Sequence, residues 1–136
     1  MHFTASMFEG CRSPLGCVAG MWLYHDQLDE AHTVAQSLDT PEGSFWHGIL
    51  HRREPDAANA AYWMRRVGKH PVFPGLRDAV SALGGSFRVG TEWDALAWID
   101  FWESTRKRPG SPDHTLALEI QRLEWQALFD YCHEKP

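Results

Sequence analysis

Apolar residues recur along this chain at intervals of three and four, the spacing of one face of an α-helix. The first such run consists of Leu28, Ala31, Ala35 and Leu38. Proline and glycine residues divide the rest of the chain into further runs, because proline interrupts helical hydrogen bonding and glycine favours helix ends. The pattern predicts helices over about 26–38, 44–54, 57–67, 75–83, 91–105 and 113–133.

Two segments carry a different pattern. Before residue 26, Gly10, Pro14, Gly16 and Gly20 predict irregular chain whose apolar residues pack on the core. In the stretch 91–105, apolar residues cover nearly the whole circumference of a helix, which predicts a buried central helix. Since only a weak strand pattern occurs, at 86–90, we expect one all-α domain, an irregular helical array. It consists of an irregular segment over 1–25, helical hairpins over 26–71, and a Trp-rich helix followed by a long C-terminal helix over 72–136.

Composition narrows the class of protein. A chain of 136 residues with 43% hydrophobic side chains and 17 aromatic rings is able to form one core without disulfides. The net charge of −5 argues against a general nucleic-acid binder. Three cysteines without C-x-x-C spacing indicate free thiols in a reducing compartment. We find no signal peptide, and the apolar stretch 17–23 is too short to span a bilayer, so we expect a cytoplasmic protein without a membrane partner.

One stretch resembles a known repeat. In HGILHRREPDAANAAYWMRRVGKHP, Gly48 stands in a first helix, Ala60 follows twelve residues later in a second, and Pro71 lies beyond its end. This spacing resembles tetratricopeptide or SEL1-type αα-hairpins, and the upstream LDEAHTVAQSLDTP resembles part of another copy. The same stretch is similar to a bacterial and fungal group of hypothetical proteins of uncharacterised function. The resemblance implies about one and a half hairpins within a helical domain.

A histidine stripe marks the first helix of this hairpin. His47, His51 and Glu54 lie at i, i+4 and i+7, within a sector of about 60°. Two histidines one turn apart are able to bind one metal ion, and we expect a divalent ion such as zinc or nickel. Because Gly48 stands where an H-E-x-x-H protease carries its glutamate, a protease motif is absent.

A metal site needs a third ligand, and the stripe alone does not supply it. Glu54 lies about 10 Å along the helix axis from His47, too far for one ion to bind both in a straight helix. The sequence offers four candidates for a third ligand without ranking them: Glu30, His70, Asp113 and His114.

The second helix of the hairpin carries another polar stripe, formed by Asn59, Tyr62 and Arg66. Two helices joined by a short turn lie side by side, so the two stripes are expected to border one groove. We predict that His47, His51 and Glu54 act there in acid–base catalysis, and that His47 and His51 bind the metal ion. Directed donors would anchor a small ligand, and we assign this role to Asn59, Tyr62, Arg66 and His70.

Two alternatives stay open for these residues. The stripe is equally typical of a solvent-facing side, with Glu54 paired to an arginine. In that interpretation Arg52, Arg53, Arg65 and Arg66 pair with Asp56, Asp100 or Glu103. The corresponding function is a tetratricopeptide-like protein- or peptide-interaction module without enzymatic activity. Whether the protein is an enzyme is therefore undecided by its sequence.

The C-terminal helix carries two apolar stripes. The first consists of Leu116, Ile120, Leu123, Ala127 and Tyr131, and the second of Leu118, Trp125, Phe129 and Cys132. One stripe is expected to pack on the core. The other needs a cover, because monomers rarely expose large apolar patches, so we expect either the N-terminal segment or a second subunit of a homodimer to cover it.

Overall fold

A computed structural model describes residues 1–136, and it contains seven α-helices, one 3-10 helix and no strand. The predicted all-α class is confirmed, and the weak strand pattern at 86–90 forms no strand. The elements are η1 (Ala5–Phe8), α1 (Pro14–Tyr24), α2 (Leu28–Ser37), α3 (Pro41–Arg53), α4 (Ala57–Val67), α5 (Phe73–Ala82), α6 (Ala95–Thr105) and α7 (Pro112–His133).

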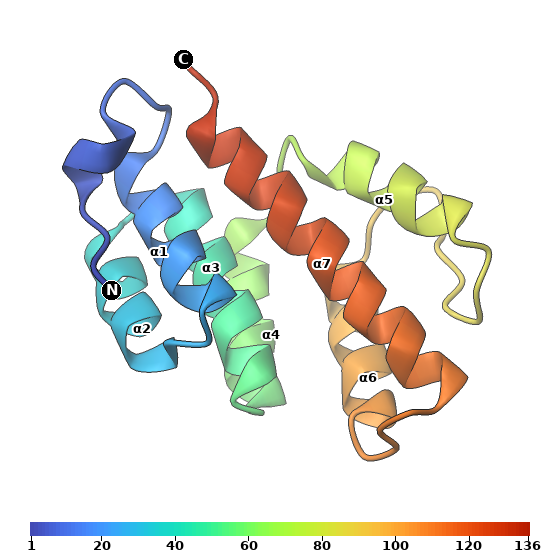
Figure 1. Cartoon of the computed structure of the whole chain (residues 1–136). Helices are drawn as coiled ribbons and strands as arrows, with labels where there is room; N and C mark the ends of the chain where they lie inside the picture. Colours follow the sequence, from blue (N-terminus) through green and yellow to red (C-terminus); the bar gives the residue numbers. More distant parts are fainter.

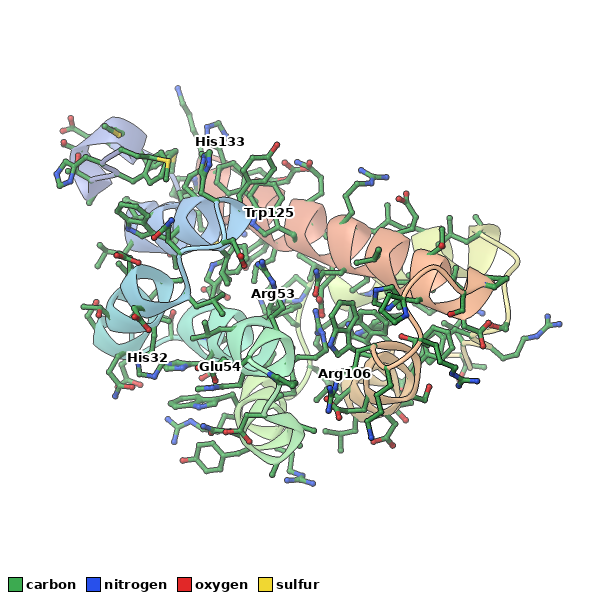
Figure 2. The ribbon with its side chains drawn as sticks, turned by 60° about the horizontal axis from the view of Figure 1, so that its bottom comes forward. His32, Arg53, Glu54, Arg106, Trp125 and His133 are labelled. Carbon is green, nitrogen blue, oxygen red and sulfur yellow. The ribbon has the colours of Figure 1, made fainter.

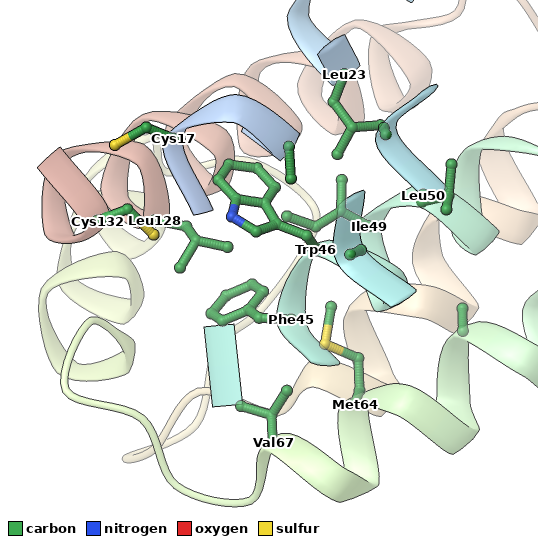
Figure 3. Close-up of a cluster of buried hydrophobic side chains, with 14 of the residues drawn as sticks. Cys17, Leu23, Phe45, Trp46, Ile49, Leu50, Met64, Val67, Leu128 and Cys132 are labelled. Atoms are coloured by element: carbon green, nitrogen blue, oxygen red, sulfur yellow. The ribbon is translucent and has the colours of Figure 1, made fainter. Parts of the chain in front are cut away.

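The long helix α7 runs diagonally across the molecule (Figure 1). In this view α5 lies on one side of α7, whereas α1 to α4 lie on the other, with α6 below the first half of α7 and next to α4. Two apolar clusters form the core. The first joins α1 to α4 with the end of α7, around the buried side chains of Phe45 and Trp46 (Figure 3). The second joins α5, α6 and the first half of α7, around Trp98 and Ile120.

The N-terminal segment corrects a prediction. We expected irregular chain over 1–25, but Pro14–Tyr24 forms α1, with Ser13 as its cap. The glycines inside α1 allow close packing instead of breaking the helix. A Cβ at Gly16 would lie 2.7 Å from Sγ of Cys132, and one at Gly20 would lie 2.8 Å from the Trp46 ring.

Helix α4 follows its predicted boundaries because the sequence supplies its caps. Asp56 accepts a hydrogen bond from the backbone N–H of Asn59, and Gly68 ends α4 with a positive φ of 64°. Pro41 occupies the first turn of α3, so this helix starts three residues earlier than predicted. Proline is tolerated there because its missing N–H would have no helical partner.

Helix α6 is less buried than predicted. Trp98, Ile99 and Trp102 are buried in the core, as expected for these apolar side chains. Asp100 and Leu96 are exposed, so one side of the helix meets solvent. The prediction of a fully buried central helix is therefore wrong, although its tryptophans do belong to the core.

The N-terminal helices cover the second stripe of α7. Phe129 packs against Phe8 of η1, with ring centroids 6.2 Å apart, and Trp125 donates a hydrogen bond to the carbonyl of Gly20. Cys132 is fully buried, and only Leu118 of this stripe stays exposed. The apolar surface that suggested a second subunit is thus covered within the chain. No helix combines the length and apolar character needed to cross a membrane.

Candidate functional site

The turn between α2 and α3 sets the geometry of the histidine site. The Thr40 hydroxyl accepts a hydrogen bond from the backbone N–H of Gly43, which fixes the first turn of α3. Gly43 is required there because a Cβ would collide with the carbonyl oxygen of Leu38. Ala31 and Ala35 are buried and small, so α2 packs closely against its neighbours. As a result, α2 and α3 lie side by side (Figure 1).

This packing brings three histidines together, His32 from α2 and His47 and His51 from α3. One ring nitrogen of each lies within 4.8 Å of the others. The ring centroid of His32 lies 5.0 Å from that of His47 and 5.6 Å from that of His51. Figure 2 shows His32 on the same side of the molecule as Glu54 at the end of α3. We call His32, His47 and His51 the histidine cluster.

His47 is the most unusual member of the cluster. Its side chain is only 1% exposed, and neither ring nitrogen has a hydrogen-bond partner in the chain. Burial, together with the charges of His32, His51 and Arg66, lowers the pKa of His47 from 6.5 to about 4. The ring is therefore uncharged at neutral pH, and an unprotonated nitrogen is available to a ligand or a metal ion.

His51 is oriented by a carboxylate. Its Nδ1 lies 2.5 Å from Oε1 of Glu54, and the amide nitrogen of Asn59 lies 3.5 Å from the same ring nitrogen. When Nδ1–H donates to Glu54, Nε2 keeps its lone pair. Metal-binding histidines commonly have this arrangement, because the carboxylate fixes the tautomer and the orientation of the ring.

Helix α4 forms the other wall of the site. The Trp63 ring stacks on His47, with centroids 3.8 Å apart and planes inclined by 6°. Gly48 leaves room for the Met64 side chain of α4, because a Cβ at that position would lie 2.6 Å from Cε of Met64 and would force that side chain to move. Arg66 lies 5.2 Å from the Trp63 ring and donates a hydrogen bond to Tyr62, which is itself exposed.

The predicted ligand-binding residues thus separate into three groups. His47, His51, Glu54 and Asn59 lie together. Tyr62 and Arg66 lie at the outer edge, against Trp63. His70 does not join them: its Nε2 lies 2.8 Å from Glu42, its Nδ1 accepts the N–H of Val72, and its ring packs against Tyr131. His70 therefore belongs to the contact between α3 and α7.

The arginine partners expected from the sequence are wrong. Arg52 pairs with Glu124 of α7, and Arg53 pairs with Asp26 before α2. Glu54 pairs with His51 instead of an arginine. The solvent-facing interpretation of the stripe is also wrong, because His51 is only 5% exposed and His47 less still.

None of the four candidates for a third ligand joins the histidine pair. Asp113 accepts a hydrogen bond from Ser86, and His114 lies beside Trp102, both at the start of α7. The third histidine is His32, which the sequence pattern did not single out. Its position three residues before the buried Ala35 was the available signal, since residues at i and i+3 lie on the same face of a helix.

A second group of potential ligands shares His51 and adds Glu54 and Asp56, both exposed. It uses a carboxylate that already binds the Nδ1 of His51, so the two groups compete for one residue. The histidine cluster is favoured because His47 has no other partner.

Comparisons with known proteins add no functional information. No family model, no curated protein and no solved structure matches this chain.

Proposed function

We propose that this protein binds one divalent metal ion, zinc or nickel, through the histidine cluster. The observation that carries the proposal is the buried, uncharged His47 with two unpartnered ring nitrogens. A buried polar group without a hydrogen bond costs about 1–3 kcal/mol, and a metal ion would supply the missing partner. His51 supports the same conclusion because Glu54 orients its ring.

The geometry agrees with a site that closes around the ion. Nitrogens bound to one tetrahedral zinc ion lie about 3.4 Å apart, since each Zn–N bond is about 2.0–2.1 Å. The ring nitrogens of the cluster lie within 4.8 Å, so modest side-chain rotations bring them into range. His32 is half-buried and is the ring with most room to rotate. Three histidines leave the fourth position to water, as in catalytic zinc sites.

Calorimetric titration of the untagged, chelator-treated protein with zinc chloride tests the proposal. We expect uptake near one equivalent at micromolar zinc. The variants His32→Asn, His47→Asn and His51→Asn should each weaken binding at least about tenfold, because each removes one ligand. His133→Asn is the matched control, since His133 is exposed and lies at the end of α7. Absence of uptake, or equal uptake by all variants, would contradict the proposal.

Glu54 is proposed as a positioning residue. Glu54→Gln should weaken zinc binding about tenfold, since carboxylates that orient metal-bound histidines typically contribute this much. Nitrogen NMR of the His51 ring supplies a second readout: the native protein should hold the proton on Nδ1, and the variant should show a mixture of tautomers. An unchanged tautomer with unchanged affinity would exclude this role.

A further inference from the structure

A second candidate site lies away from the histidine cluster. A cavity of about 710 Å³ is bounded by the end of α4, the start of α5 and the segment 87–97 that leads into α6. Pockets of roughly 300–1,000 Å³ accommodate small organic molecules. None of the three histidines lines this cavity, so it is independent of the proposed metal site.

The cavity has apolar walls that are held in place. Its apolar lining includes Met64, Phe73, Phe87, Val89, Trp93 and Leu96. Phe87 packs against Phe101 with ring centroids 4.9 Å apart and against Trp93 at 6.1 Å. The Nε of Arg77 on α5 donates a hydrogen bond of 2.8 Å to the carbonyl of Gly90, which ties the segment 87–97 to α5. The site is therefore formed without a ligand.

The cavity lining also includes three cationic side chains. Arg65 and Lys69 come from the end of α4 and the residues after it, and Arg88 comes from the opposite segment. All three are exposed, and none has an ion pair or a side-chain hydrogen bond, whereas the guanidinium group of Arg77 donates to both Gly90 and Asp78. Their charges are available to a ligand.

The remaining charges of the lining leave the cavity positive. Glu92 and Asp94 oppose the three cations, for a formal balance of +1. Asp94 is already engaged, because its Oδ1 accepts the backbone N–H groups of Leu96 and Ala97 as the cap of α6. Two helices, α5 and α6, begin at the cavity, and only α4 ends there, so helix dipoles add further positive potential.

We propose that this cavity binds a small organic anion with a flat apolar body. The anionic group would lie between Arg88 and the pair Arg65 and Lys69, and the apolar body would contact Phe87 and Trp93. Arginine suits this role because its planar fork binds carboxylate, sulfonate or phosphate oxygens in pairs.

Two fluorescent probes with the same apolar body test the proposal. 1-Anilinonaphthalene-8-sulfonate carries an anion, and N-phenyl-1-naphthylamine does not. We expect the sulfonate to bind the folded protein with one saturable site, and to bind at least about fivefold more tightly than the neutral amine. Its affinity should fall as salt rises from about 20 to about 500 mM, because salt screens exposed cations.

Charge variants locate the site. Arg65→Gln/Arg88→Gln should weaken the sulfonate about tenfold and leave the neutral amine unchanged, since only the anion uses these charges. Arg122→Gln, on the exposed side of α7, is the matched control and should bind both probes normally. His47→Asn should also bind both normally, which separates this site from the metal site. Equal affinity for the two probes, or full sulfonate affinity in the double variant, would overturn the proposal.

Discussion

Helix α3 contributes to two buried polar clusters that differ in one respect. On one side, Arg52 and Glu124 are both fully buried, and their side chains meet at 2.5 and 3.2 Å. Trp98 donates a further hydrogen bond of 3.2 Å to Glu124, so both carboxylate oxygens have partners and only Nε of Arg52 has none. On the other side, the buried His47 has no partner at either ring nitrogen.

This difference suggests different roles for the Arg52–Glu124 pair and the histidine cluster. Buried polar groups are almost always satisfied, and a cluster that is satisfied within its own chain connects elements of the fold. Arg52 and Glu124 connect α3 to α7 in this way. A buried ring with no partner at either nitrogen costs free energy, and a water molecule or an ion would supply the missing partner. We therefore interpret the ion pair as structural and the histidine cluster as the functional candidate.

The largest expected effect concerns the ion pair. Arg52→Met leaves the charge of Glu124 buried without its counter-ion and should lower the free energy of unfolding by about 3–5 kcal/mol. Urea unfolding followed by tryptophan fluorescence measures this change. The double variant Arg52→Met/Glu124→Leu should regain most of the loss, since the unpaired charge is gone. Native-like stability of the single variant would contradict the structural role that we assign to the ion pair.

The next effect concerns pH, measured on protein kept free of metal by a chelator. The folded-state pKa of His47, about 4, lies below its unfolded value of 6.5. Between these pH values the unfolded state binds the extra proton, so stability is full above pH 6.5 and is lost as pH falls toward 4. The loss amounts to about 3 kcal/mol. Comparing the pH dependence of unfolding with that of His47→Phe isolates the contribution, which the variant should lack.

The smallest expected effect is an increase in the free energy of unfolding. His47→Phe keeps a ring stacked on Trp63 and removes the two unsatisfied nitrogens, so the metal-free protein should gain about 1 kcal/mol at neutral pH. The same variant should lose the rise in melting temperature that we expect zinc to give the native protein. A loss of stability comparable to that of Arg52→Met would mean that His47 is structural after all.

Local signals in the sequence predicted the helices better than the contacts between them. Asp56, Gly68 and the break 109–112 fix the ends of their helices through backbone chemistry, which acts within a few residues. Helix α1 was missed because Gly16 and Gly20 are typical of irregular chain. These positions need glycine because Cys132 and Trp46, which are distant in the sequence, pack closely against them. No local sequence pattern reveals such a contact.

The candidate site shows the same limit. The pair His47 and His51 followed from helical spacing, and Glu54 from its place one turn later. His32 joins them only through the packing of α2 on α3, which depends on Ala31 and Ala35. His70 failed as a member because its environment comes from Glu42, Phe45 and Tyr131. The tetratricopeptide resemblance stays a prediction, although Gly48 does lie against α4.

The contact between α1 and the end of α7 has a consequence for biosynthesis. The backbone N–H groups of Arg12 and Ser13 donate to the carbonyls of Glu134 and Cys132, and Trp125 bonds to Gly20. The N-terminus of a nascent chain leaves the ribosome first, so α1 leaves the exit tunnel before the end of α7 is synthesised. During that interval the face of α1 that packs on α7, which includes Gly16 and Gly20, is exposed to chaperones and to neighbouring nascent chains. The final helix thus completes the fold only after translation has passed residue 134.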